Sequence, residues 1–584
     1  MVYNEIGEVS EMKINDVKKL TGLTQKAIRL YESKGLIQIS RSENGYRNYS
    51  QDNVNTLKTI KLLREAGITI TDIKLYLFGV ISLDELLVKR KKEILDEKGR
   101  NSDQYLFCES ITSGIMNGGV RQDKVFTEFE EIKKSCSGTL CVGIDLGTTN
   151  ISAVVMDIEN KEQVEAYSIP HMSDIPSKIY SEQRVDVILE KAEKLLFHII
   201  KAHKGVRSIG ITGQMHGIVY VDTKGRAVSN LINWQDKRGD CVLENGETVC
   251  GEIKNVTGEN VFTGYGVASH YYNMKKGLVP ENAVGFCSIM DVFAMKLCGM
   301  KTAVTHNSVG ASIGLFDIQK GQFKFDKLDM LGIKKQFLPS VTPLSCVIGS
   351  WNGISVSVPI GDNQASFIGS MREIGEGVLI NIGTGSQISA ASDYCKVNSE
   401  LELRPFIEGK YLVCGSALCG GSSYAMLEQF FRSYAVSIGM MDAPQYSIMN
   451  EIAKEAYERG DTGVKVNTSF YGKRSDPDCR GSIEMIDSHN FTPSAFILGL
   501  LKGICEELYS LYKVFPETKS HAVASGGAVK KNAILKKLIE DRFEMDVSLN
   551  KMWEEAATGA ALFSALAIGL LEYKGGFPEF IKYG

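Results

Sequence analysis

Two segments of the sequence share one layout, and they constrain the fold more than any other feature. CVGIDLGTTNISAVVMD, which begins at Cys141, and VLINIGTGSQISAAS, which begins at Val378, each read as an apolar strand, a tight Gly-Thr turn and a second strand. The repetition indicates an internal duplication. From residue 139 onward the pattern alternates strands, glycine-rich turns and helices. The sequence therefore predicts an α/β enzyme built from two lobes.

The N-terminal end of the chain differs from the rest in charge. Residues 11–100 contain 18 Lys/Arg and 12 Asp/Glu, whereas the whole chain has a net charge of −4. The remainder is therefore acidic, and the chain as a whole is not a protein that coats nucleic acid. Hydrophobic residues make up 43% and charged residues 23%, which excludes collagen-like, mucin-like and wholly disordered chains.

The basic end begins with INDVKKLTGLTQKAIRLYESKGLI, which reads as two short helices around a tight turn. Val17 and Leu20 are expected to face inward, Gly22 to make the turn and Thr24 to cap the second helix. The exposed face of that helix carries Gln25, Lys26 and Arg29, whose side chains can bond base edges and phosphates.

A hairpin and two further helices follow. Asn44-Gly45 is a strong two-residue hairpin signal, flanked by Arg41, Arg47 and Tyr49. Apolar residues then recur at helical spacing: Val54, Leu57, Ile60, Leu63, Ile70, Ile73 and Leu77.

Three stretches of residues 11–80 resemble the winged helix-turn-helix DNA-binding domain of the MerR family. They are Ile28-Arg29-x-Tyr31-Glu32-x-x-Gly35-Leu36, Gly45-Tyr46-Arg47-x-Tyr49 and Leu63-Arg64-x-x-Gly67. The resemblance implies that Gln25, Lys26 and Arg29 approach the major groove of a double-stranded DNA operator, while Tyr31, Arg47 and Tyr49 hold phosphates. It also implies a homodimer, with Leu83 to Lys98 in the helical connector of residues 81–139 as the dimerisation helix. The alternative is a small helical docking domain with a solvated basic face.

The duplicated turns contain residues that can bind phosphate. Asp145 ends an apolar strand, and backbone N–H groups and hydroxyls of Gly147, Thr148 and Thr149 can cradle a phosphate. A carboxylate beside phosphates normally serves a divalent cation and its waters. Taken alone, this turn is equally compatible with a plain hairpin. Related segments follow along the chain: PIGDNQASFIGS with Asp362, NIGTGSQIS with Gly383 and Thr384, and VASGGAVKKNAILKKLIEDRF with Gly526 and Gly527.

A separate pair of segments places polar and aromatic side chains just past predicted strands. SIGITGQMHGIVYVD places Gln214, Met215 and His216 just past a buried strand, and NWQDKRGD places Trp234 and Asp236 in the next loop. An indole face packs on sugar C–H groups, while imidazole and carboxylate groups bond hydroxyls. For His216 alone, a satisfied structural histidine is the more common reading.

In this order, the pieces resemble the FGGY family of carbohydrate kinases, which have the two-lobed actin/hexokinase-like (ribonuclease H-like) fold. The resemblance implies an N-terminal lobe at residues 140–372 and a C-terminal lobe at residues 373–584. It implies that ATP and Mg²⁺ are required, with Asp362 as the catalytic base and Asp145 holding Mg²⁺ through water. It further implies a sugar site of Gln214, Met215, His216, Trp234, Asp236 and Asp362. The implied phosphate and nucleotide site comprises Asp145, Gly147, Thr148, Thr149, Gly383, Thr384, Gly420, Gly421, Gly526, Gly527 and Asn532. Lys531 lies where the family often has Asn or another polar residue.

Within the family, the Gly-Gln-Met-His-Gly motif resembles that of kinases that act on ketoses. Sedoheptulose is favoured over xylulose as the substrate by two further segments, GSALCGGSSYAMLEQFF and TSFYGKRSDPDCRGSIEMI. Three functions remain open: a ketose kinase fused to a transcriptional regulator, a sugar-sensing regulator without turnover, and a kinase whose N-terminal domain only assembles a dimer. Thirteen scattered cysteines without a C-x-x-C pair favour reduced thiols in a cytoplasmic protein. We expect no signal peptide and no membrane partner.

Overall fold

The computed structural model describes residues 12–41, 46–77, 83, 86–87, 90, 139–177, 179–461, 463–472, 476 and 478–584. The described residues form two compact units: one holds those up to Thr139 together with His203–Arg207 and Gly349–Ser355, and the other holds the rest of residues 140–584. No helix of these ranges is long and apolar enough to cross a bilayer. No disulfide joins the cysteines of these ranges.

The N-terminal unit is a helix-turn-helix with a short hairpin. It contains α1 (Ile14–Thr21), α2 (Gln25–Ser33), β1 (Ser40–Arg41), β2 (Arg47–Asn48), α3 (Gln51–Glu65) and α4 (Ile70–Leu77). Gly22 ends α1 with a φ of 66°, and the Thr24 hydroxyl accepts a bond of 3.2 Å from Ala27 N at the start of α2. The apolar residues of α3 are buried as expected, but Leu20 is 50% exposed. The inward placement of Leu20 was therefore wrong: Val17 and Thr21 are the buried residues of α1, and Ile14 also packs on the core of the unit.

The tip of the hairpin, with Asn44-Gly45, lies outside the described residues. Most of the connector 81–139 does so too, including the bulk of the expected dimerisation helix from Leu83 to Lys98.

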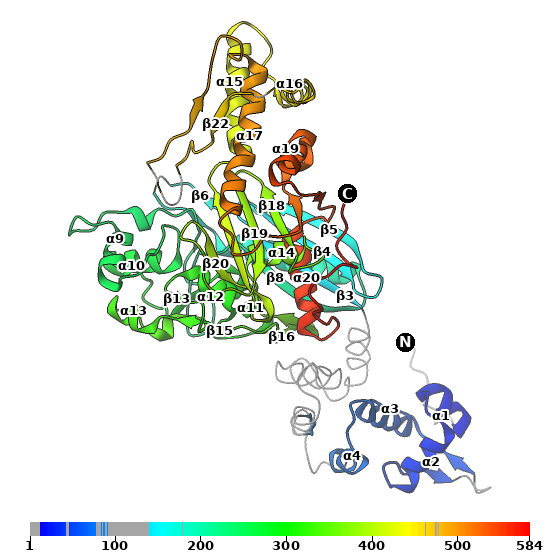
Figure 1. Cartoon of the computed structure of the whole chain (residues 1–584). Coiled ribbons are helices and arrows are strands. Elements are labelled where there is room, and N and C mark those ends of the chain that lie inside the picture. The colour runs from blue at the N-terminus through cyan, green and yellow to red at the C-terminus, as the bar shows by residue number, and fades with distance from the viewer. Residues whose placement is uncertain are drawn as a thin grey trace, which may run out of the picture. The chain divides into compact units, whose positions relative to one another are not determined.

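The second unit, which we call the kinase unit after the resemblance of its sequence, is built around two six-stranded sheets, one in each lobe (Figure 1). The first has the order β16 (Val347–Trp351), β17 (Ile354–Ser357), β8 (Val206–Gly213), β3 (Leu140–Leu146), β4 (Asn150–Asp157), β5 (Glu162–Pro170). The second has the order β20 (Glu402–Pro405), β21 (Tyr411–Ala417), β19 (Ser386–Ser392), β18 (Gly377–Ile382), β24 (His521–Ser525), β25 (Val547–Leu549). Each sheet contains one of the two duplicated segments as an antiparallel hairpin, β3–β4 and β18–β19. The expected duplication is confirmed at the level of the fold.

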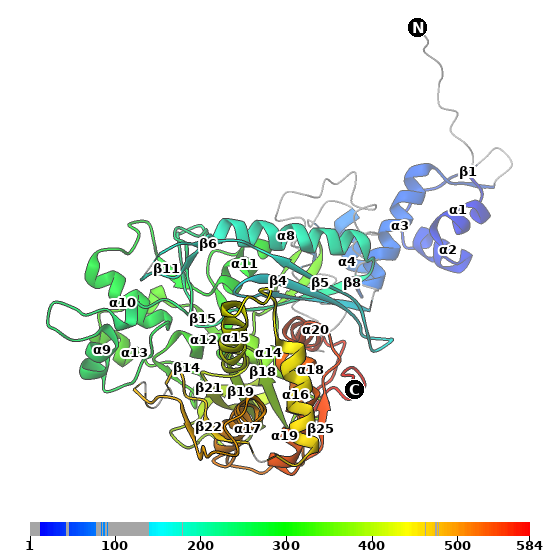
Figure 2. The same cartoon turned by 90° about the horizontal axis from the view of Figure 1, so that it is seen from above.

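Helices cover both sheets. Figure 2 shows α8 (Val185–Ala202) running along the first sheet, with its apolar face buried. On the second sheet, α16 (Tyr446–Glu458), α17 (Pro493–Tyr512) and α19 (Ala533–Phe543) share one core with β18, β19 and β24. This lobe also contains the helices α15 (Gly421–Ser437), α18 (Gly527–Lys531) and η3 (Ile407–Gly409). A separate two-stranded sheet is formed by β22 (Lys465–Asn467) and β23 (Ser482–Glu484).

An insertion of small elements extends the first lobe. Its strands are β6 (Asp174–Ile175), β7 (Glu182–Gln183), β9 (Val219–Val221), β10 (Leu231–Ile232), β11 (Gly285–Cys287), β12 (Val304–His306), β13 (Phe316–Asp317), β14 (Gln322–Phe323) and β15 (Ser340–Thr342). Its helices are η1 (Arg238–Asp240), α9 (Val249–Thr257), α10 (Gly266–Lys276), α11 (Ile289–Cys298), α12 (Asn307–Ile313), α13 (Phe325–Met330) and η2 (Lys335–Phe337).

Two helices join the lobes at the centre of the kinase unit. α20 (Glu555–Ala567) packs against β3 and against α14 (Asp362–Ile368), and all three are formed largely by small or apolar residues. The backbones approach so closely that a Cβ on Gly559 would lie 1.8 Å from Ala365 O, and one on Gly143 would lie 1.8 Å from Ala557 O. Only glycine fits at these two contacts, and the result is a tightly packed crossing between the sheets.

Candidate active site

The first phosphate loop is fixed from its carbonyl side. It spans Gly147 to Thr149, between β3 and β4. The Thr148 carbonyl oxygen lies 2.8 Å from His171 Nε2 and accepts a bond of 2.7 Å from Gln183 Nε2, and Gly147 O accepts one of 3.3 Å from Gln214 Nε2. Because these side chains hold its carbonyl groups, the loop keeps one conformation. A loop that binds an anion through its backbone N–H groups requires such rigidity.

The second loop, Gly383 to Gly385, is held in the same way. Gly421 N donates to Gly383 O at 2.8 Å, and Ser422 N donates to Thr384 O at 3.0 Å, so the start of α15 sits against the loop. At Gly420 a Cβ would lie 2.5 Å from Gly385 O, which explains the glycine. The predicted residues Gly383, Thr384, Gly420 and Gly421 are therefore brought together.

The two predicted acids lie near each other. Asp145 is at the end of β3, and Asp362 is the first residue of α14. Burial, together with the charges of Asp362 and Glu554, raises the pKa of Asp145 to about 8. Burial also raises the pKa of Asp362 to about 6, although the nearby Arg404 opposes that rise. The charges of two carboxylates thus oppose the ionisation of Asp145, an arrangement that a cation relieves.

Asp145 and Asp362 differ in the hydrogen bonds that their carboxylates make. Asp145 Oδ1 is buried and has no partner among the described residues. Asp362 Oδ1 accepts from Asn363 N at 2.6 Å and from Asn363 Nδ2 at 3.0 Å. The amide groups of Asn363 therefore fix the Asp362 carboxylate through one oxygen.

The sugar motif lies beside Asp362. Asn363 Nδ2 is 3.8 Å from Met215 Sδ, so the Gln214–His216 turn contacts the start of α14. His216 has a φ of 69°, a strained value for a residue with a side chain. Its ring stacks on Tyr265 with 4.4 Å between centroids, and its Nδ1 is 2.8 Å from Ser312 O. The imidazole is thus held in one orientation.

The second sugar loop contacts the first phosphate loop. Trp234 is 46% exposed, and its Nε1 donates to Thr148 Oγ1 at 3.0 Å. Asp236 instead is fully buried: Oδ2 pairs with Arg238 at 3.1 Å and accepts from Ser181 N at 2.9 Å, while Oδ1 accepts from Arg238 N. The structure brings Trp234 to the site, whereas both oxygens of Asp236 are occupied within its own loop.

The predicted nucleotide segment lies at the end of β24. Gly526 and Gly527 begin α18, and Gly526 has a φ of 92°. Asn532 caps α19: its Oδ1 accepts from Ile534 N at 3.1 Å and Leu535 N at 3.2 Å. A cavity of about 540 Å³ lies nearby, lined by Tyr167 and Ser168 of β5, by Lys530, and by Trp553, Glu554 and Glu555.

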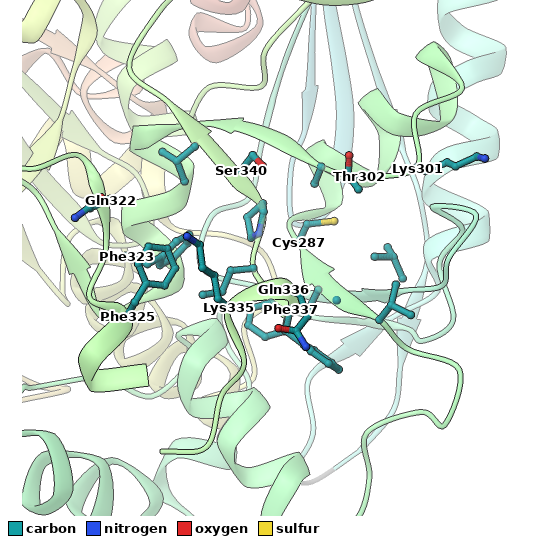
Figure 3. A pocket seen from close by; sticks show the side chains of 18 of the residues that line it. Cys287, Lys301, Thr302, Gln322, Phe323, Phe325, Lys335, Gln336, Phe337 and Ser340 are labelled. Carbon is teal, nitrogen blue, oxygen red and sulfur yellow. The ribbon is translucent and has the colours of Figure 1, made fainter. Parts of the chain in front are cut away.

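A larger cavity, of about 820 Å³, lies elsewhere (Figure 3). Cys287, Lys301, Lys335 and Phe337 are among its lining residues, and none of the predicted phosphate or sugar residues is. Cavity size alone therefore does not locate the chemistry of this chain.

The predicted DNA-binding residues divide into two groups. Lys26 and Arg29 are exposed on α2, and Gln25 is partly exposed and bonded to Asn15 at 2.7 Å. Arg47 pairs with Glu32 at 2.8 Å, and the Tyr31 and Tyr49 side chains belong to the core of the unit. Tyr31 and Tyr49 therefore support the fold first, and their contact with phosphates stays a prediction.

Sequence reasoning missed several residues of the site. Tyr265 and Ser312, which hold His216, and Glu554 and Arg404, which affect the two acids, come from segments distant along the chain. Glu554 had one local signal, because it directly precedes the small-residue helix α20.

Comparison with known proteins agrees with this geometry. Residues 140–369 match the N-terminal domain of the FGGY family of carbohydrate kinases, and residues 12–78 match the MerR HTH family regulatory proteins. A sedoheptulokinase of Mus musculus is 25% identical over 473 residues, covering 73% of this chain and 97% of the relative. A xylulose kinase of Staphylococcus epidermidis is 25% identical over 459 residues, covering 73% and 88%.

The solved structures show the same fold. The ligand-bound xylulose kinase of Lactobacillus acidophilus superposes with a TM-score of 0.66 at 20% identity, covering 76% of this chain and 92% of that one. A gluconate kinase of the same organism gives 0.66 at 21% identity, with the same coverage. The expected two-lobed kinase fold is confirmed. By these matches residues 12–78 are a MerR-family helix-turn-helix domain, residues 140–369 are an N-terminal domain of the FGGY family, and the chain is a carbohydrate kinase.

Proposed function

We propose that the kinase transfers the γ-phosphate of ATP to a terminal hydroxyl of a ketose, sedoheptulose or xylulose. The observation that carries the proposal is the contact of the Gln214–His216 turn with the start of α14, beside Asp362. The names of two relatives, a sedoheptulokinase and a xylulose kinase, support these two sugars.

In this proposal Asp362 is the base. It accepts the proton of the sugar hydroxyl that attacks the γ-phosphorus, and Asn363 holds its other oxygen in place. A pKa of about 6 leaves Asp362 ionised at neutral pH and close to the pH at which a base works best.

The sugar contacts are assigned to Gln214, Met215, His216 and Trp234. His216 and Gln214 would bond hydroxyls, and the exposed indole of Trp234 would cover C–H groups. Because both oxygens of Asp236 are occupied, we assign it to holding the Trp234 loop through Arg238 rather than to a direct sugar contact.

Asp145 fits a divalent cation. It has a buried oxygen without a partner and a pKa raised by two nearby acids, and both conditions favour a positive ion. No group of three His, Cys, Asp or Glu side chains in the described residues could hold a metal by itself. We therefore propose that Asp145 holds Mg²⁺ through water, and that bound Mg²⁺ neutralises charge on the ATP phosphates.

The remaining nucleotide contacts are assigned to backbone. The loops of Gly147–Thr149 and Gly383–Gly385, with Gly420 and Gly421, would surround the phosphates, and their N–H groups would stabilise the transferring group. Gly526 and Gly527 would lie under the adenine ring, with Asn532 as the cap that orients the helix behind them.

The test is a measurement of ADP release with xylulose, ribulose, sedoheptulose and glycerol. We expect one ketose to give the highest kcat/KM. Asp362→Asn should lower kcat by about 10²–10⁴-fold with a nearly unchanged dissociation constant for the sugar. Wild-type turnover by Asp362→Asn would disprove the assignment of the base. Ketose binding without turnover in the wild type would favour the sugar-sensing regulator.

A second function is proposed for residues 12–78, namely sequence-specific binding of a double-stranded DNA operator as a homodimer in the cytoplasm. The exposed set of Lys26 and Arg29 beside Gln25 on α2 favours base contacts over a purely structural domain. Selection from random DNA followed by gel shift tests it. A recovered near-palindromic consensus is expected, and no consensus would leave a domain that only assembles the kinase.

A further inference from the structure

The edge strand β20 carries a buried positive charge, and its C-terminal end contacts the helix that begins with the proposed base. Arg404 is only 8% exposed. Its Nε and Nη2 both donate to Glu402 Oε2, at 3.2 and 2.5 Å. Its Nη1 is buried and has no hydrogen-bond partner among the described residues. A guanidinium buried with one unsatisfied nitrogen is costly, so packing alone does not account for it.

The strand is tied closely to the helix of Asp362. Gln364 Nε2 of α14 donates to Pro405 O at 3.0 Å in a buried bond. Phe367 of α14 meets Phe406 edge to face with 5.6 Å between centroids. The residues that follow Asp362 on α14 are therefore held against the residues that follow Arg404.

A third element fixes the same corner. α12 packs on β20, and its Ser308 Oγ accepts a bond of 3.1 Å from Gly361 N, just before Asp362. The positions of Arg404 and Asp362 thus follow from buried contacts on three elements.

We propose that Arg404 is a positioning residue of the transfer reaction, whose charge keeps Asp362 as the carboxylate that accepts the sugar proton. The proposal rests on the assignment of Asp362 as the base. It goes beyond it by assigning a function to a strand that contributes no phosphate or sugar loop.

The other titratable groups near Asp362 are acids, a thiol and two histidines. Asp145 on β3 and Glu554 before α20 are acids, and Cys414 on β21 is a buried thiol whose pKa is raised by burial. His306, which caps α12, is neutral because burial lowers its pKa to about 4. His216 is the titratable group of the sugar turn. Arg404 is the group that lowers the pKa of Asp362 through its charge.

The experiment is the pH dependence of kcat/KM, measured by ADP release with the preferred ketose. Arg404→Met should move the acid limb to higher pH by about one unit, since an ionised neighbour of opposite charge depresses a carboxyl pKa by about 1–3 units. Arg404→Lys should restore the wild-type limb. Glu402→Gln should move the limb to lower pH, because it leaves the charge of Arg404 less compensated.

The matched control is Arg459→Met, which removes an arginine paired with Asp461 on the exposed end of α16 and should leave the limb in place. An unshifted limb in Arg404→Met, with Asp362→Asn inactive, would overturn the role of Arg404 alone. An active Asp362→Asn would overturn the base assignment itself. If Arg404→Met does not fold, an unmoved limb in Glu402→Gln overturns the proposal.

Discussion

Replacing Asp145 with asparagine should stabilise the kinase unit while it abolishes phosphoryl transfer. The carboxylate is placed where it is hardest to ionise, since it is buried, has an unbonded Oδ1 and lies near the charges of Asp362 and Glu554. Asparagine has the same shape and no charge, so it removes the cost of ionisation and leaves the packing as it is.

The sign of the effect follows from the two pKa values. The pKa of Asp145 is about 8 in the folded chain, against an ordinary 3.8. Between these values the folded state keeps a proton that the unfolded state has released, so the free energy of unfolding falls as the pH rises. At pH 7.5 the largest gain in the free energy of unfolding that Asp145→Asn could give is about 5 kcal/mol, because each pKa unit corresponds to about 1.4 kcal/mol. Local relaxation reduces it, and we expect Asp145→Asn to gain about 2 kcal/mol.

Tryptophan fluorescence can follow the kinase unit alone, because the three tryptophans are Trp234, Trp351 and Trp553. In EDTA at pH 7.5 the melting temperature of Asp145→Asn should rise by about 2 °C, since a unit of roughly 440 residues shifts by about 1 °C per kcal/mol. The gain should shrink as the pH is lowered towards 5. With Mg²⁺ and ATP added, the wild type should gain more than the variant. Asp329→Asn, on the exposed surface of α13, is the control.

A variant that melts at or below the wild-type temperature at pH 7.5 without cation would refute the reasoning. It would mean that Asp145 is compensated in the free protein. A gain that persists unchanged at pH 5 would equally contradict it, because the difference would then not arise from ionisation.

Three further predictions follow from the other sites. His216→Ala should raise the KM of the ketose by about 5–10-fold, the value of one hydrogen bond, and leave the KM of ATP within about twofold in steady-state titrations; equal effects on both would exclude a sugar contact. Arg29→Ala should weaken operator binding by about 1–3 kcal/mol, whereas Arg47→Ala should lower the salt slope of log K by about one, both measured by fluorescence anisotropy at several salt concentrations. Saturating ketose should change operator affinity by about 5–150-fold in Asp362→Asn, with a reciprocal change in sugar affinity; identical constants, with the sugar shown to be bound, would mean two independent domains.

Local patterns in the sequence were sufficient for the elements that carry the phosphate chemistry. The Gly-Thr turns predicted the hairpins β3–β4 and β18–β19, and Thr24 predicted the start of α2. These predictions hold because turn and cap residues act on neighbours within three or four positions. The prediction that Leu20 is buried was wrong, because the exposure of an apolar residue on a short helix depends on which elements of the fold pack against that helix.

Long-range contacts could not be predicted from one sequence. Tyr265 reaches His216 from the start of α10, and Arg404 reaches the region of Asp362 from an edge strand of four residues with no motif. The ion pair of Asp236 with Arg238 of its own loop was likewise not predicted. Residue type suggested a ligand, and only the fold shows that its oxygens are taken.

The crossing of α20 with β3 and α14 has a consequence for synthesis on the ribosome. Gly143 and Gly210 of the first sheet lie against the backbone of α20, which belongs to the last thirty residues of the chain. The first lobe therefore emerges with one face of its sheet uncovered. The roughly 200 residues between α14 and the end of α20 take about 10–40 s to translate. During that interval this apolar face of the first lobe lacks its covering helix, and only the synthesis of α20 supplies it.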